Sequence, residues 1–143
     1  MRAIKDLSRL LCSLEPQLQD TEFVFCTVEG DLSDYISLQP IATFMESEGV
    51  SLVLEKSAAE QTKLDFEGAY KLITLSVHSS IQAVGLTAAL SKVLADEGIS
   101  ANIIAAYHHD HVFVPATRAI DALACLKLLS EQAQLQLKPN ERL

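Results

Sequence analysis

The sequence predicts an α+β protein built from two related ferredoxin-like (βαββαβ-type) units, each with helices on one face of an antiparallel sheet. Three features predict this class: an internal repeat with a spacing of 49 residues, segments of strand-like alternation, and an amphipathic helix that a glycine ends. With 143 residues, 49% of them hydrophobic and 21% charged, the chain has the composition of a globular protein that buries a core. We expect a first, degenerate unit at residues 1–68 and a second unit at residues 69–143.

The repeat is clearest in one short segment. Glu48-Gly49-Val50-Ser51 reappears 49 residues later as Glu97-Gly98-Ile99-Ser100. The same spacing pairs side chains of similar character in the preceding segments: Val24 with Ile73, Thr27 with Ser76, Val28 with Val77, Ile41 with Leu90, Phe44 with Val93 and Met45 with Leu94. Because a strand, a helix and a helix-ending glycine match in phase, the pattern indicates duplicated structure.

The second unit has the more regular pattern. Residues 70–78 alternate as a strand, with Ile73, Leu75 and Val77 on one face. Ser79 and Ser80 offer N-cap oxygens to an amphipathic helix that Gly98 ends. The remaining elements follow in order: a strand over 99–107, the hairpin link His108-His109-Asp110, a strand over 111–114, and a last helix capped by Thr117. The two helices are expected to bury Leu86, Ala89, Leu90, Val93 and Leu94, and Ile120, Leu123, Ala124 and Leu128.

The first unit is less regular. Its expected elements are a helix over 4–14, a strand over 23–28, an acidic linker over 29–37, a short helix from Pro40 to Gly49, a strand over 50–56 and a further strand near 64–67. Each unit therefore lacks the last strand of the ferredoxin-like pattern. We expect the two halves to lend elements to each other, and their open faces to join within the chain or between chains.

Composition excludes several classes of function. A formal net charge of -8 disfavours nucleic acid and anionic membrane surfaces as partners. The first sixteen residues are interrupted by Lys5, Asp6 and Arg9 and do not form a signal peptide, and no stretch approaches the ~18 apolar residues of a membrane span. The three cysteines are expected to be reduced core residues: Cys12, Cys26 and Cys125. We therefore expect a soluble, cytoplasmic protein.

Three segments resemble the ACT domain family, whose members are ferredoxin-like regulatory modules that bind amino acids. Gly85-Leu86, seven residues of helix and then Leu94 to Ser100 carry the strongest resemblance. Residues 105–115 resemble the hairpin of tandem ACT proteins such as the cytosolic arginine sensors, and residues 46–54 resemble that subfamily's first half. The resemblance implies an amino-acid-binding module like those of aspartate kinase, here acting on a separate partner.

The resemblance also implies where a ligand would sit: at the start of the helix, across an interface from the second strand of a neighbouring module. The residues carried over are His78, Ser79, Ser80, Val84, Gly85, Leu86, Ser100, Ala101, Asn102 and Asp110. A helix start presents free N–H groups that suit a carboxylate, and Gly85 lets a ligand approach the backbone. Gly85 could equally serve to pack the helix on the sheet. Asp110 could recognise an amino or guanidinium group, or simply favour a tight turn.

The histidines allow two interpretations. His78, His109 and His111, with Asp110 near them, could hold Zn²⁺. The alternative is a polar hairpin tip whose histidines stack at a dimer contact, and we favour it because the spacing is not diagnostic of a metal site.

No catalytic motif of the nucleophile-elbow, P-loop or dinucleotide-binding type is present. We therefore expect a protein without catalytic activity or cofactor, which binds an amino acid and forms a homo-oligomer, most simply a dimer, or regulates a separate enzyme. The alternatives are a structural interaction module without a ligand, and a metal-dependent hydrolase at the histidines.

Overall fold

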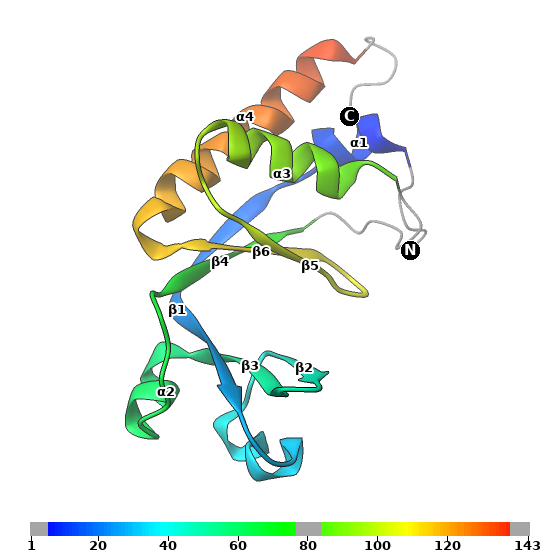
Figure 1. The fold of residues 1–143 in the computed structure, drawn as a ribbon. Coiled ribbons are helices and arrows are strands. Elements are labelled where there is room, and N and C mark those ends of the chain that lie inside the picture. The colour runs from blue at the N-terminus through cyan, green and yellow to red at the C-terminus, as the bar shows by residue number, and fades with distance from the viewer. Residues whose placement is uncertain (1–5, 77–83, 138–143) are drawn as a thin grey trace.

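The computed structural model describes residues 6–76 and 84–137. One antiparallel sheet of six strands, in the order β2-β3-β1-β4-β6-β5, runs through these residues (Figure 1). The strands are β1 (Pro16–Val28), β2 (Ala42–Glu46), β3 (Gly49–Glu55), β4 (Tyr70–Leu75), β5 (Asn102–Ala105) and β6 (Asp110–Pro115). The helices are α1 (Leu7–Cys12), α2 (Lys56–Gln61), α3 (Leu86–Asp96) and α4 (Ala119–Gln136), with the 3-10 turns η1 (Leu32–Asp34), η2 (Ile36–Leu38) and η3 (Ala116–Arg118). Among these helices none is both long and apolar enough to span a membrane.

Strand β1 belongs to both halves of the sheet. Its first residues pair with β4, as Leu18 does with Ile73, and its last residues pair with β3, from Phe23 to Val28. The register shifts between Leu18 and Glu22, so the strand bends where it passes from one half to the other (Figure 1). Helix α1 likewise packs on α4 and α3 of the second half. The expectation that the halves lend elements to each other is confirmed.

Two apolar cores lie beneath the helices. The core under α1, α3 and α4 includes Leu90, Leu94 and Leu126, which pack against Ile73 and Val112 of the sheet. The core of the first half joins β1 and β3 to α2, through residues such as Leu52 and Ala59. A third cluster lies on the opposite face of the sheet and contains Phe23, Val53, Leu72 and Phe113. Both faces of the central strands are therefore buried.

Helix α3 forms and ends as the sequence predicts. Leu86, Leu90 and Leu94 recur at four-residue intervals and are all buried. Gly98 has φ +70, and the N–H of Ile99 donates to the carbonyl of Leu94 at 2.9 Å, which closes the helix with a left-handed residue. The N-cap position is Gly85, so the prediction that Ser79 or Ser80 caps this helix is wrong. The predicted caps Ser79 and Ser80, with Val77 and His78, lie outside the described residues.

The predicted helix over residues 40–49 is wrong, because this segment forms strand β2. Ile41, Phe44 and Met45 have helical spacing, yet all three side chains are exposed and residues 42–46 pair with β3. Gly49 then returns the chain into β3 with φ +152, and a Cβ there would lie 2.7 Å from the Val28 carbonyl oxygen. Hairpin pairing with the next strand thus overrode a weak helical pattern.

Two other elements of the first half differ from expectation. The helix α2 (Lys56–Gln61) lies between the strands expected over 50–56 and near 64–67, where no helix was expected, and residues 64–67 are irregular rather than a strand. Leu64 and Phe66 nevertheless pack against the first-half core. These two side chains explain why the segment had an apolar pattern without pairing into the sheet.

The repeat is real only for the central strands. Val24 and Ile73 both lie in central strands of the sheet, β1 and β4, but the 49-residue spacing then places β2 on α3. Glu48-Gly49 stands at a hairpin turn, whereas Glu97-Gly98 ends a helix. No single spacing fits the whole repeat. In the first half the short turns η1 and η2 precede β2, whereas in the second half the eleven-residue helix α3 precedes β5. Both β2 and β5 are edge strands.

The predicted inward face of the last helix is wrong. Ile120 is 77% exposed and Leu128 53% exposed, Ala124 is also exposed, and Leu123 is only partly buried. The buried residues of α4 are instead Ala119, Ala122, Leu126 and Ser130. Thr117 does not cap the helix but lies in η3. Apolar residues surround much of this helix, so its pattern alone could not select a face, and the small alanines allow close approach to the sheet.

Candidate ligand-binding site

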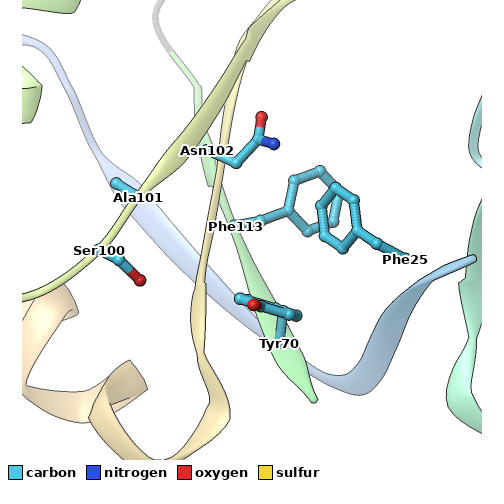
Figure 2. A pocket seen from close by; sticks show the side chains of 6 residues that line it. All are labelled: Phe25, Tyr70, Ser100, Ala101, Asn102 and Phe113. Atoms are coloured by element: carbon cyan, nitrogen blue, oxygen red, sulfur yellow. The ribbon is translucent and has the colours of Figure 1, made fainter. Parts of the chain in front are cut away.

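A pocket of about 230 Å³ opens beside the edge strand β5 (Figure 2). One wall is aromatic and comes from three strands: Phe25 of β1, Tyr70 of β4 and Phe113 of β6. The other wall is the segment Ser100-Ala101-Asn102, where the chain enters β5. We call this cavity the β5 pocket. It brings together residues from both halves of the sheet.

Strand register explains why the aromatic side chains meet. Phe23 pairs with Tyr70, Leu72 pairs with Phe113, and Phe113 pairs with Asn102, so these side chains lie on one face of the sheet. This face is opposite the one that α3 and α4 cover. Phe25 lies two residues from Phe23 and shares its face.

The aromatic rings pack edge to face. The ring centroids of Phe25 and Tyr70 are 5.2 Å apart at an angle of 74°, and those of Phe25 and Phe113 are 5.5 Å apart at 82°. Such pairs stabilise by about 0.5–1.5 kcal/mol beyond the area they bury. The aromatic wall is therefore held in a fixed geometry.

The chemistry of the β5 pocket is apolar with a few polar groups. Among the described residues that line the pocket, the polar side-chain groups are the hydroxyls of Ser100 and Tyr70 and the carboxamide of Asn102, and none of these residues is charged. Ser100, Ala101 and Asn102 are exposed. The pocket suits an apolar group that carries hydrogen-bonding atoms at one end.

Gly85, the predicted contact at the helix start, lies at the other end of α3. Its φ of +97 requires glycine, and a Cβ there would lie 3.0 Å from Cδ2 of Leu7. Val84 beside it is exposed, whereas Leu86 is buried in the core. Gly85 therefore has a backbone conformation that favours glycine and a close contact with α1. Both interpretations of this glycine, ligand approach and helix packing, remain predictions.

Gly85 and the β5 pocket do not form one site within a single chain. The eleven residues of α3 separate them, which corresponds to about 16 Å at the rise of an α-helix. Asp110 does not reach the pocket either, because it is 4% exposed and pairs with Leu75 on the helix-covered face. Of the predicted ligand-binding residues that the structure describes, three line the cavity: Ser100, Ala101 and Asn102.

The histidines of the hairpin lie near one another, and the ring centroids of His108 and His109 are 6.4 Å apart. His111 pairs with Thr74 on the open face, with its Nδ1 3.1 Å from the Thr74 hydroxyl oxygen. Burial lowers the pKa of His111, neighbouring His109 lowers it further, and Asp110 acts in the opposite direction. The Nδ1 atom of His109 is buried and has no hydrogen-bond partner among the described residues. In residues 6–76 and 84–137 no group of three His, Cys, Asp or Glu side chains could hold a metal ion, and His78 is outside this range.

Comparison with known proteins identifies the family. Two models of the ACT domain match the chain in tandem, one over residues 2–71 and the other over residues 67–127. The chain is a tandem ACT-domain protein. ACT domains are regulatory modules, so the family gives this ACT pair a regulatory, ligand-binding character.

Solved structures agree with this assignment. A Vibrio cholerae protein of unknown function is 53% identical, with a TM-score of 0.81, and the match covers 88% of this chain and 97% of that one. The aspartokinase α and β subunits match with a TM-score of 0.65 at 12% identity, over 81% of this ACT pair and 97% of that chain. The ligand-free regulatory subunit of aspartate kinase from Thermus thermophilus matches with a TM-score of 0.55 at 13% identity, over 80% of this chain and 95% of that chain. No curated protein matches. At these identities the aspartate kinase structures establish the fold alone.

Sequence reasoning missed the aromatic wall of the β5 pocket. Phe25, Tyr70 and Phe113 come from three strands, and only their register brings them together. One signal was available: Phe23 and Phe25 alternate with Val24 and Cys26, so β1 is apolar on both faces. A strand that is apolar on both faces indicates burial on both sides.

Proposed function

We propose that this ACT pair is a regulatory protein without catalytic activity, which binds an amino acid and acts on a separate enzyme or regulator. The β5 pocket is the observation that carries the proposal. It is an apolar cavity with a few polar groups, it lies at an open sheet edge, and it is lined by residues from both halves of the chain. This combination is typical of small-molecule sites.

The β5 pocket suits the apolar part of an amino acid. The aromatic wall suits an apolar or aromatic side chain, and Asn102 and Ser100 offer hydrogen bonds beside it. Because no charged side chain is among the described residues that line the pocket, the ligand's carboxylate needs donors from elsewhere. A second copy of the chain could supply them from the N-terminus of its α3, at Gly85, and β5 is an edge strand with an open side for such a copy. The proposal therefore includes a homo-oligomer, most simply a dimer.

Regulation would follow because ligand binding is thermodynamically linked to the relative arrangement of the two modules. A ligand that prefers one arrangement of the modules shifts the population toward it, and a partner protein reads that shift. Phe25 lies in β1, which pairs with strands of both halves. A ligand against Phe25 would therefore contact the strand through which the two modules are joined.

Thermal melting in the presence of each proteinogenic amino acid tests the proposal. A ligand at a hundred times its dissociation constant adds about 2.7 kcal/mol of stability, which raises the melting temperature by several degrees. Asn102→Ala should reduce this shift, because it removes a pocket carboxamide. Gln132→Ala changes an exposed residue of α4 and should leave the shift intact. A shift that Asn102→Ala leaves unchanged would place the ligand elsewhere, and no shift with any amino acid would contradict the proposal.

A structural interaction module without a ligand is the second candidate. The edge strand β2 favours it, since Phe44 is 70% and Met45 60% exposed there, and exposed apolar groups on an edge strand suit protein association. Phe44→Ser should then lower self-association, or binding of a partner, without lowering stability. Sedimentation equilibrium of the two proteins measures the difference, and identical association would count against this candidate.

A further inference from the structure

A second cavity lies between the end of α1, the start of β1 and the C-terminal half of α4 (Figure 1 shows these elements). Its volume is about 300 Å³, at the lower end of the range for small-molecule pockets. Its polar lining includes Glu15 and Gln17 near the start of β1, and Lys127, Ser130, Glu131 and Gln134 on α4. We call it the α1–α4 cleft.

Three charged side chains of the α1–α4 cleft have no ionic partner in the part of the chain that the structure describes. Ion pairs there join Lys56 to Glu22, Lys92 to Asp96 and Arg118 to Asp121. Lys127 and Glu131 have the same four-residue spacing on α4 as Lys92 and Asp96 on α3, where the Nζ and Oδ2 atoms are 2.9 Å apart. The charges of Lys127, Glu131 and Glu15 are therefore available to a ligand.

Ser130 places a buried polar group in the same cleft. Its side chain is 7% exposed and lines the cavity, and its hydroxyl makes no hydrogen bond to the residues that the structure describes. By contrast, Ser91 on α3 donates to the Thr87 carbonyl at 2.8 Å. The Ser130 hydroxyl oxygen is not among the buried atoms that lack a partner, so it is accessible from the cleft, where a ligand can hydrogen-bond to it.

The walls of the cleft are fixed by specific contacts. Gln134 Nε2 donates to the carbonyl oxygen of Cys12 at 2.8 Å, which ties α4 to α1. Glu15 has φ +43, a left-handed conformation that non-glycine residues seldom adopt, and the following Pro16 restricts it further. The Ser76 hydroxyl donates to the Glu15 carbonyl oxygen and holds this turn.

We propose that the α1–α4 cleft binds a small zwitterion of the α-amino-acid type. Its carboxylate would pair with Lys127, its ammonium group would lie between Glu15 and Glu131, and Ser130 would donate or accept one further hydrogen bond. Lys127 selects against simple cations, and the two carboxylates select against simple anions. Among the described residues, none lines both the cleft and the β5 pocket. Pro16 pairs with Leu75, at the opposite end of β4 from Tyr70, so the two sites stand independently.

Amide NMR with glycine as the probe tests the proposal, because glycine carries both charges and no side chain. Glycine titrated into ¹⁵N-labelled protein should shift the signals of Glu131 and Gln134 saturably, whereas acetate and methylammonium at equal ionic strength should not. Lys127→Gln and Glu131→Gln should each weaken binding about tenfold, the effect of losing one charge-assisted hydrogen bond. Lys92→Gln removes a lysine of the same spacing on α3 and should have no effect.

Ser130→Ala gives a readout that separates a ligand contact from a packing role. The proposal predicts weaker glycine binding with no loss of thermal stability, because the hydroxyl has no partner in the free protein. Equal shifts with acetate and methylammonium would show nonspecific charge effects and overturn the proposal. Shifts confined to Ala101 and Asn102 would also overturn it, while they would support the function proposed for the β5 pocket. No saturable shift in the cleft would reject the site.

Discussion

At the scale of single residues, Gly49 and Gly68 form a matched pair. Both have positive φ, but a Cβ on Gly49 would lie 2.7 Å from the Val28 carbonyl oxygen, whereas nothing lies within 4 Å of a Cβ on Gly68. Gly68→Ala should cost about 1–2 kcal/mol from backbone strain alone. Gly49→Ala should cost clearly more, because a backbone oxygen of β1 must move. Urea unfolding measures both, and equal costs would mean that the β2–β3 turn is less tightly packed on β1.

His111 makes stability depend on pH. Its pKa is lowered in the folded state, first by burial and then by His109, so the unfolded chain binds the proton more readily. Stability from this group is therefore present above the unfolded pKa of 6.5 and is lost as pH falls through and below it. His111→Gln should make the free energy of unfolding depend less on pH between about pH 7 and 5. Free energies of unfolding measured by urea at several pH values test this, and a slope for His111→Gln identical to that of the unaltered protein would contradict the account.

At the scale of elements, α4 offers a direct test of which helix face is buried. Leu126 is fully buried and Leu128 is 53% exposed. Leu126→Ala should destabilise the protein by about 2–5 kcal/mol, whereas Leu128→Ala should change stability by less than about 1 kcal/mol. Denaturant unfolding of the two variants decides the question. The reverse order would restore the face predicted from the sequence.

Elements with strong local signals were predictable. Leu86, Leu90 and Leu94 defined α3, Gly98 marked its end, and Ile73 and Leu75 were correctly expected on one face of their strand. Strand β2 was not predictable, because Ile41, Phe44 and Met45 have helical spacing and only pairing with β3 makes the segment a strand. The face of α4 likewise depended on packing that the local sequence does not encode.

The candidate site was predictable on one side only. Ser100, Ala101 and Asn102, which the family resemblance singled out as ligand-binding residues, line the β5 pocket, and their binding of a ligand stays a prediction. The aromatic wall depends on the register of β1, β4 and β6, which are distant in sequence. The charged lining of the α1–α4 cleft was hidden for the same reason, because Glu15 and Lys127 meet only through the packing of α1 on α4.

At the scale of the whole molecule, the shared strand β1 should make the two modules unfold together. Since β1 pairs with both β3 and β4, neither half keeps its central strands if the other unfolds. Urea unfolding should therefore give one transition, coincident by tyrosine fluorescence and by far-ultraviolet circular dichroism. Two separate transitions would show that each module is stable without its neighbour.

The central claim is that a small molecule binds in the β5 pocket, and amide NMR of the ¹⁵N-labelled protein with a mixture of the proteinogenic amino acids tests it most directly. The account predicts saturable shifts at Ala101 and Asn102, with smaller ones beside Phe25 and Tyr70, and their loss in Asn102→Ala. Unchanged signals around the β5 pocket at saturating concentrations would contradict it.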